Sequence, residues 1–381
     1  MIQLNNDFLN ELTTIRRRLH QVPEISFDLP KTQAIITEYL SKYGYQFEEV
    51  AQTGIVAVKH GMSDTAIAFR ADMDALMVTE ETGVDYTSKH PGQMHACGHD
   101  GHMTMLLGLA KYMAQFEDLN RNLVFIFQPA EEGPGGAKTI IEEGILKRHN
   151  VEAIFGIHIF PNLDEGKIGL GKGPLMAQNG EVDILVKGRS SHGAMPHKGS
   201  DALVAASNLV MSYQSIVSRN LDPLEPAILT LGSVKGGEAR NIIANKIELN
   251  GTIRAFNPEY YNLIKSKMDS INKGLEEMYD VNIEMEIRDF YPPVLNDENL
   301  FETALKSLER NQIEFVKPVM LAEDFAFYQQ EIPGLFMFLG SKNTQQGYTH
   351  PLHSCYFNYN EKILLEGVKT YISICEQMDV F

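Results

Sequence analysis

The chain has few cysteines and no long uninterrupted apolar segment. Its three cysteines, Cys97, Cys355 and Cys375, are odd in number and far apart, which argues against a disulfide framework and fits a reducing cytoplasm. No run of about 18 uncharged apolar residues is present, so neither a transmembrane helix nor a membrane partner is expected. The first residues lack the pattern of a secretory signal and predict an amphipathic helix that ends before Pro23.

Basic residues are also in short supply. The chain has 33 Lys and Arg against 50 Asp and Glu, a formal net charge of −17. Such a surface repels polyphosphates, so nucleic acid is not an expected partner. The length of 381 residues allows two domains or one large domain with an insertion, and 44% apolar with 22% charged residues is typical of a globular protein.

Strands and helices alternate along the first part of the chain. Residues 54–61 predict a strand, and apolar runs at 65–72, 122–129 and 153–160 predict buried strands, while residues 101–116 and 135–146 predict helices. This order indicates an α/β fold with a parallel or mixed sheet covered by helices. In such sheets, binding sites form at the carboxyl ends of the strands.

The middle of the chain has a different pattern. Strand, helix, strand, strand, helix and strand are expected between 181 and 290, the order of a ferredoxin-like unit. Asn257 is expected to cap the second helix, with Pro258 at its first position. One apolar stripe is predicted on the first helix, formed by Leu203, Ala206, Val210, Tyr213 and Val217. We therefore predict a catalytic domain of residues 1–174 and 291–381 with an inserted domain of residues 175–290.

The segment MHACGHDGHM, residues 94–103, is the densest in possible metal ligands. Cys97 and His99 lie just before a predicted helix, whose N-terminus favours the thiolate that binds metal. A structural zinc site requires a second Cys/His pair at short spacing, and the chain has none. A metal here would need carboxylates and distant histidines, which is typical of catalytic sites.

Other segments carry suitable side chains at or beside predicted strand ends. Glu131 and Glu132 follow a strand, and adjacent residues of an extended chain point to opposite sides, so one could hold a metal while the other transfers protons. His158 ends another strand. Taken alone, the two acids also fit a solvated turn and His158 a core histidine. Further candidates are Asp72 and Asp74 after a strand, and His350 and His353 in a loop before the last helix.

The sequence resembles the aminoacylase-type amidohydrolases, a branch of the dinuclear metallopeptidases that includes hippurate hydrolases, auxin–amino-acid conjugate hydrolases and N-acetyl-diaminopimelate deacetylases. The resemblance runs through the whole chain, and the pair HACGHD and PAEEG is its most specific part. The motifs that carry it are RRRLHQVPEISF, FRADMDAL, MHACGHDGHM, FQPAEEGPGGA, GIHIFPNLDEGKIG, GRSSHGAMPHKGSDAL, RNIIANKIELNGTIRAF, AEDFAFY and HPLHS.

The resemblance implies a role for individual residues. Glu131 matches the general base, and Asp74 matches the acid that orients the metal site. Asp72 stands where the peptidase branches have a metal-binding histidine, and His99 takes over that role. Cys97 matches a bridging position that is an aspartate in the peptidases. The implied ligands of two divalent ions (Zn, Mn, Co or Ni) are Cys97, His99, Glu132, His158 and His353.

The resemblance also implies that the inserted domain is a lid through which a homodimer forms. His192 matches a histidine that stabilises the oxyanion and can come from the neighbouring subunit. Asn241 and Arg254 match positions that bind polar groups of the substrate, and a carboxylate can pair bidentately with Arg254. Where the family often has proline two residues after the last metal histidine, this chain has Cys355, which we interpret as a buried free thiol.

The prediction is a cytoplasmic, metal-dependent amidohydrolase that cleaves small N-acyl amino acids, with N-acetyl as the first acyl group to test. A dipeptidase or carboxypeptidase with the same chemistry is the alternative, and Cys97 in place of aspartate argues against it. Two further hypotheses are a metal-binding protein without turnover and a thiol hydrolase that uses Cys97 as nucleophile. The sequence leaves open the acyl group, the amino acid and the metal.

Overall fold

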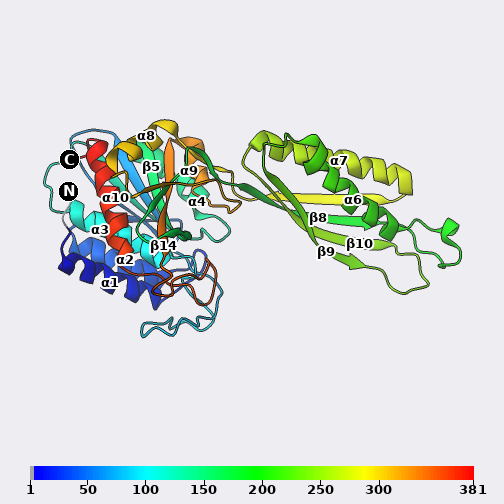
Figure 1. Cartoon of the computed structure of the whole chain (residues 1–381), viewed down its shortest axis with the longest axis horizontal. Coiled ribbons are helices and arrows are strands. Elements are labelled where there is room, and N and C mark those ends of the chain that lie inside the picture. Colours follow the sequence, from blue (N-terminus) through cyan, green and yellow to red (C-terminus); the bar gives the residue numbers. More distant parts are fainter. Residues whose placement is uncertain (1–3) are drawn as a thin grey trace. The chain divides into compact units, whose positions relative to one another are not determined.

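The computed structural model describes residues 4–381, which divide into two compact units. The first unit contains the chain through Gly173, Leu295–Lys317 and Asp324–Phe381. The second unit contains Pro174–Val294 and the short segment Pro318–Glu323 (Figure 1). The boundaries expected from sequence placed 318–323 with the first unit, because that segment follows the insertion by almost 30 residues.

The first unit is built on an eight-stranded mixed sheet. Its strands in spatial order are β1 (Phe47–Val50), β2 (Gly54–Lys59), β4 (Asn122–Gln128), β3 (Ala66–Asp72), β5 (Val151–Asp164), β14 (Gly334–Lys342), β6 (Ile168–Leu170) and β13 (Ile313–Phe315). Strand β3 is parallel to both β4 and β5, and β5 is parallel to β14. The carboxyl ends of β3, β4 and β5 therefore meet at one edge, where α/β sheets place their sites.

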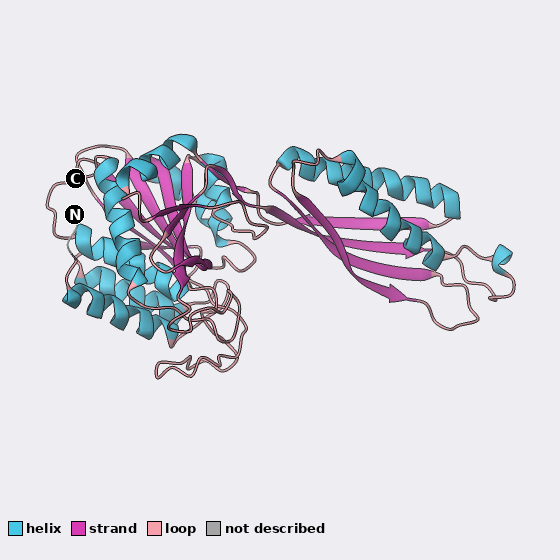
Figure 2. Ribbon diagram, in the orientation of Figure 1, coloured by secondary structure: helices cyan, strands magenta, loops and turns pink. Residues whose placement is uncertain are grey.

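Helices cover both faces of this sheet (Figure 2). The helices of the unit are α1 (Asn6–His20), α2 (Pro30–Lys42), α3 (His99–Met113), α4 (Gly136–Glu142), α5 (Ile145–Arg148), α8 (Glu298–Ser307), α9 (Ala326–Glu331) and α10 (Ile363–Gln377). Apolar side chains of α1, α3, α8 and α10 form one continuous core with the strands. The α/β fold expected from the alternating pattern is confirmed.

Helix α3 lies against the sheet and is almost entirely buried. Its packing is close at Gly101, where a Cβ atom would lie 2.3 Å from the hydroxyl oxygen of Tyr359 and 2.6 Å from Ile159 Cδ1. A larger residue there would push the first turn of α3 away from β5. This close approach sets the position of His99 at the start of the helix.

The second unit has a four-stranded antiparallel sheet in the order β11 (Asn282–Asp289), β8 (Gln178–Lys187), β10 (Lys246–Ala255) and β9 (Ala227–Gly236). Helices α6 (Ala202–Asn220) and α7 (Pro258–Tyr279) share a core with these strands, and a short 3-10 turn (Pro196–Lys198) precedes α6. Asn257 caps α7 by accepting from the Glu259 N–H, and Pro258 begins the helix, as predicted. Strands β7 (Gly173–Met176) and β12 (Val294–Asn296) form a separate two-stranded sheet.

The predicted apolar stripe of α6 is only partly correct. Leu203 is 51% exposed, whereas Ala202, Leu209 and Ile216 are buried with Tyr213. The cause is that α6 carries apolar residues on more than one face, so periodicity alone does not select the buried one. The helix is left with an exposed apolar face, formed by Leu203, Val204 and Met211.

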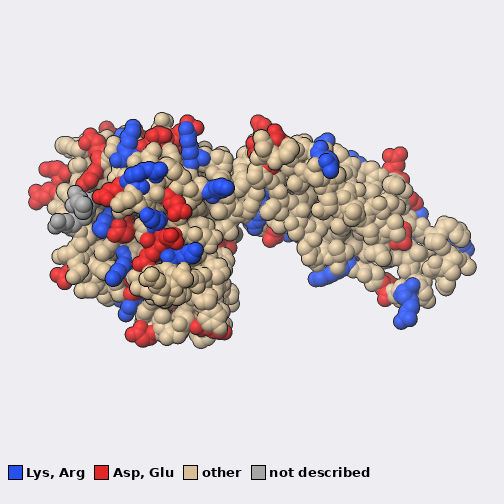
Figure 3. All heavy atoms as spheres, in the orientation of Figure 1, with Lys and Arg blue, Asp and Glu red and all other residues tan. Residues whose placement is uncertain are grey.

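Acidic and basic side chains are interspersed over the visible face of the first unit rather than gathered in one patch (Figure 3). Within residues 4–381, no helix combines the length and the apolar composition needed to cross a membrane.

Candidate metal centre

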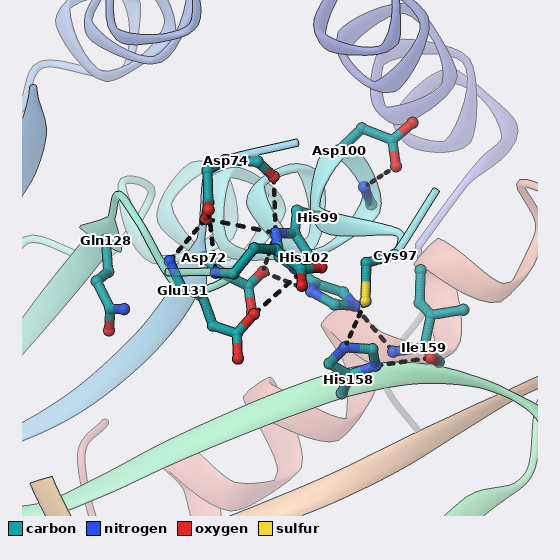
Figure 4. A network of polar contacts seen from close by, with 12 residues as sticks. Asp72, Asp74, Cys97, His99, Asp100, His102, Gln128, Glu131, His158 and Ile159 are labelled. Carbon is teal, nitrogen blue, oxygen red and sulfur yellow. Dashed lines mark hydrogen bonds and ion pairs between the residues drawn. The ribbon is translucent and has the colours of Figure 1, made fainter. Parts of the chain in front are cut away.

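The candidate centre is built around the loop after β3. Asp74 accepts the backbone N–H groups of Glu131 at 2.8 Å and of Glu132 at 3.0 Å, one with each carboxylate oxygen. Its backbone carbonyl lies 2.8 Å from Nδ1 of His99. One residue thereby holds the acid pair and the first helical histidine in place (Figure 4).

Glu131 and Glu132 lie in a turn, not in extended chain. Their carboxylates therefore do not point to opposite sides as expected: Glu131 Oε2 is 4.0 Å and Glu132 Oε1 is 3.9 Å from Nε2 of His99. The sequence pattern missed this because the turn depends on the distant Asp74. Both acids face the same buried imidazole.

Cys97 and His99 are placed by the start of α3. Between them, Gly98 has a φ of 89°, a left-handed conformation that favours glycine. Since Nδ1 of His99 lies against a carbonyl, Nε2 faces the acids and has no hydrogen-bond partner among residues 4–381. The Cys97 sulfur lies 3.4 Å from Nε2 of His158 on β5.

His102 has a structural position. Its Nδ1 lies 2.6 Å from Asp72, and its Nε2 accepts the backbone N–H of Ile159 at 2.9 Å. Both ring nitrogens are thus used in holding β3 and β5 to α3. His95 is also buried, at 2% exposed, and its ring nitrogens form no hydrogen bond with residues 4–381.

His353 reaches this cluster from the loop before α10. Its Nε2 is 3.4 Å from Glu132 Oε1, and its side chain is 53% exposed. Its neighbour in the predicted loop pair, His350, instead lies beside the ring of Tyr356 at a centroid distance of 5.2 Å.

Among residues 4–381, five groups of side chains have ligand atoms close enough to share an ion, and two of these groups contain Cys97. The first is Cys97, His99 and His158; the second is Cys97, Glu132 and His353. The buried Oε1 of Glu132, like Nε2 of His99, has no hydrogen-bond partner in the described chain. Buried nitrogen and oxygen atoms without hydrogen-bond partners, beside a thiol, are donors that would fit divalent cations.

Electrostatics of the cluster also favour a cation. Burial raises the pKa of the Cys97 thiol well above its ordinary value, and Glu132 and Glu131 raise it further. Burial alone would lower the pKa of His99, but Asp72 and Asp74 raise it to about 10. The expected effect of the helix N-terminus on the thiol is therefore outweighed. A thiolate at position 97 needs a positive partner such as a metal ion.

The remaining predicted site residues belong to the second unit. His192 is exposed between β8 and α6, and the N–H of the next residue, Gly193, donates to the carbonyl of Asn241 at 2.8 Å. Arg254 lies on β10 opposite Asn179. It is half-buried, which lowers the pKa of its guanidinium, and its side chain forms no hydrogen bond or ion pair with any of residues 4–381. The structure brings His192 and Asn241 together. Asn241 precedes the start of β10, whereas Arg254 lies near the end of that strand.

A buried charged network around the start of α3 had no role in the sequence interpretation. Arg16 Nε donates to Asp100 at 2.9 Å, and the ring nitrogens of His20 lie 2.7 Å from Asp100 and 3.2 Å from Glu80. Because Asp100 directly follows His99, these contacts fix the first turn of α3. The motif RRRLHQVPEISF contains Arg16 and His20. The sequence did not reveal that Asp100 is their partner, because Arg16 and Asp100 are 84 positions apart.

The motif AEDFAFY supplies a second buried network through Asp324. Arg70 donates to Asp72 and to Asp324, each at 2.7 Å, and the Gln128 amide donates to Asp324 at 2.8 Å. Asp72 ends β3 and Gln128 ends β4. These contacts hold together the strand ends that carry the centre.

Comparisons with known proteins show relatives along most of the chain. Residues 68–377 match the model of peptidase family M20/M25/M40. An N-acetyldiaminopimelate deacetylase of Listeria monocytogenes is 42% identical over 87% of this chain and 91% of its own, and the IAA-amino acid hydrolase ILR1-like 4 of Arabidopsis thaliana is 38% identical over 97% and 86%.

A solved structure extends the likeness to the fold. The Bacillus subtilis YxeP protein, described as a dinuclear metal-binding peptidase of the M20 family, aligns with a TM-score of 0.87 and 31% identity. The alignment covers 99% of this chain and all of that one. The chain therefore belongs to peptidase family M20/M25/M40, and it is an amidohydrolase of the aminoacylase-type branch of that family.

Proposed function

We propose that the protein hydrolyses the amide bond of small N-acyl amino acids with two divalent metal ions and Glu131 as general base. The observation that carries this proposal is the pair of ligand groups that share Cys97, with the Glu131 carboxylate beside His99. The curated relatives are named for the deacetylation of N-acetyldiaminopimelate and for the hydrolysis of an IAA-amino acid. Both names fit an acyl group on an amino acid.

Cys97, His99 and His158 would hold one ion, and Cys97, Glu132 and His353 the other. When bound, such ions lower the pKa of water and polarise a carbonyl. Glu131 accepts a proton from the attacking water and then donates it to the leaving nitrogen. Asp74 fixes the base through the Glu131 N–H. Nitrogen, sulfur and oxygen donors together suit Zn, Mn, Co or Ni.

Arg254 is the proposed partner of the substrate carboxylate. A half-buried guanidinium without a partner in the described chain is costly unless a ligand supplies the negative charge. Asn241 is proposed to bind another polar group of the substrate. A substrate whose carboxylate is capped as an amide should consequently bind less well.

The second unit is proposed to be a ferredoxin-like lid and the dimer contact. Its β-α-β-β-α-β order, the unpaired edge of β9 and the exposed apolar face of α6 support this role. About 26 Å of strand, at about 3.3 Å per residue, separates Asn179, opposite Arg254, from Lys187 at the other end of β8. His192 lies beyond Lys187, so one lid does not supply Arg254 and His192 at the same point. In a two-fold dimer the oxyanion histidine comes from the partner copy.

Mixing two inactive variants tests whether each active site takes His192 from the partner copy. Glu131→Gln and His192→Ala are each expected to abolish turnover as pure proteins. After subunit exchange, half of the dimers are mixed and each has one intact site, so activity should recover to roughly a quarter of wild type. Exchange is verified by native mass spectrometry. A mixture that exchanges and stays inactive would rule out the shared site.

The proposed activity is tested on a panel of acetyl, benzoyl and longer N-acyl amino acids, each with a free or amide-capped carboxylate. We expect release of the amino acid by the metal-replete protein, preference for the free carboxylate and loss of release after chelation. Cleavage of dipeptides alone would indicate a peptidase. Bound metal without any turnover would indicate a metal-binding protein.

Activity that survives chelation would favour a thiol hydrolase. The raised pKa of the Cys97 thiol, caused by burial and then by Glu132 and Glu131, argues against that hypothesis, because the neutral thiol is a poor nucleophile.

A further inference from the structure

His353 differs from the other proposed ligands in how it is held. Cys97, His99 and His158 are buried in the strands and in the start of α3, whereas the His353 side chain is 53% exposed. Its backbone has a φ of 65°, in the left-handed region that non-glycine residues rarely adopt. Such a conformation persists only where surrounding contacts fix it.

Direct contacts to His353 are few. Its N–H donates to the carbonyl of Ala96 at 2.8 Å, which joins the loop to the residue before Cys97. Most of the residues from 342 to 351 are exposed, and firm burial of the chain resumes only at Phe357. The conformation at His353 therefore depends on how the residues between it and Phe357 are held.

Those intervening residues are clasped by Glu81. The Glu81 N–H donates to the carbonyl of Cys355 at 2.9 Å, and its carboxylate accepts a hydrogen bond from the hydroxyl of Tyr356. We call these two contacts the Glu81–Tyr356 clasp. They join the loop that carries His353 to the long connection between β3 and α3.

The residue before Glu81 is held by contacts of its own. The Glu80 carboxylate accepts the N–H of Ser88 at 2.7 Å and lies 3.2 Å from Nε2 of His20. His20 is bound to Asp100 beside His99. Adjacent acids thus face two ways: Glu80 toward the network under α3, and Glu81 toward the loop of His353.

We infer that Glu81 and Tyr356 are positioning residues that hold His353 as a ligand. The inference rests on the proposed function. His353 belongs to only one of the two ligand groups, with Cys97 and Glu132. Loss of the clasp should therefore weaken one metal site and spare the site formed by Cys97, His99 and His158. The two ions are held unequally, and the ion bound by His353 leaves first.

The test is titration of metal-free protein with Zn²⁺ against a chromophoric chelator. Wild type should take up two equivalents. In Tyr356→Phe, the weaker equivalent should bind up to about 10-fold less tightly, the usual net contribution of one hydrogen bond, while the tighter one is unchanged. The matched control is Tyr43→Phe, which removes the hydrogen bond from the Tyr43 hydroxyl to Glu11 at 2.9 Å, between two residues that belong to none of the candidate ligand groups.

A second pair of variants separates positioning from general loosening of the loop. Glu81→Gln can still accept from Tyr356 and should keep the wild-type affinity, whereas Glu81→Ala should weaken the same equivalent as Tyr356→Phe. The double variant Glu81→Ala/Tyr356→Phe should be no weaker than Glu81→Ala, since both changes remove one contact.

Equal Zn²⁺ affinities in Tyr356→Phe and wild type would overturn the inference, as would equal weakening of both equivalents. Wild type that binds fewer than two equivalents would contradict the proposed function instead. The two failures are therefore distinguishable in one titration.

Discussion

Replacement of Glu131 by glutamine should lower kcat by about 10³-fold, within the range that a positioned acid–base group contributes. Glutamine keeps the shape of the side chain and can occupy the same turn, because Asp74 binds the backbone N–H of residue 131 and not its side chain. It cannot take a proton from water at neutral pH. Metal content, measured by elemental analysis, should stay at the wild-type value.

The neighbouring acid is the informative comparison. Glu132→Gln changes a proposed ligand, so it should lose metal as well as activity, and added Zn²⁺ should restore part of the activity. Glu142→Gln, at an exposed position of α4, should alter neither. Turnover of Glu131→Gln within a fewfold of wild type would refute the assignment of the base.

Replacement of Arg16 by methionine should destabilise the first unit by about 3–5 kcal/mol, the usual cost of removing one partner of a buried ion pair. Arg16 is 1% exposed, and Asp100 is fully buried. Burial alone would raise the pKa of Asp100, but the Arg16 guanidinium and then the His20 hydrogen bond hold that pKa well below its ordinary range. Methionine fills similar volume but supplies no charge.

The measurement is the shift in the midpoint of urea unfolding, monitored with a probe that reports on the first unit. The control is Arg18→Met, which breaks an exposed pair with Glu38 and should cost about 0–1 kcal/mol. Adding Asp100→Asn to Arg16→Met should recover part of the loss, since it removes the unpaired charge. An Arg16→Met midpoint no lower than that of Arg18→Met would show that the buried pair contributes little.

Local pattern predicted the elements that carry the centre. The buried strands that precede Asp74 and Glu131, and the one that contains His158, are apolar runs that only a covered sheet accommodates. Helix α3 begins at His99, two residues before the predicted range of 101–116. The Asn257 cap of α7 is equally local. Each of these depends on neighbours within a few positions.

What the sequence did not predict depends on contacts between distant residues. The turn of Glu131 and Glu132 is fixed by Asp74, 57 positions earlier. The left-handed conformation of His353 depends on Ala96 and on the Glu81–Tyr356 clasp. Such pairings have no periodicity along the chain, so no local sequence pattern predicts them.

Asp74 has a further consequence for how proteins with this centre diversify. Its carboxylate binds the amides of a proposed base and a proposed ligand, and its carbonyl contacts His99. A mutation at this position would alter proton transfer and metal affinity in a single event, so selection has no gradual route through it. Exposed positions nearby in the chain, such as Met77 at 73% exposed, do not hold the base or a ligand in this way. Substitutions there are expected to leave the acid pair in place.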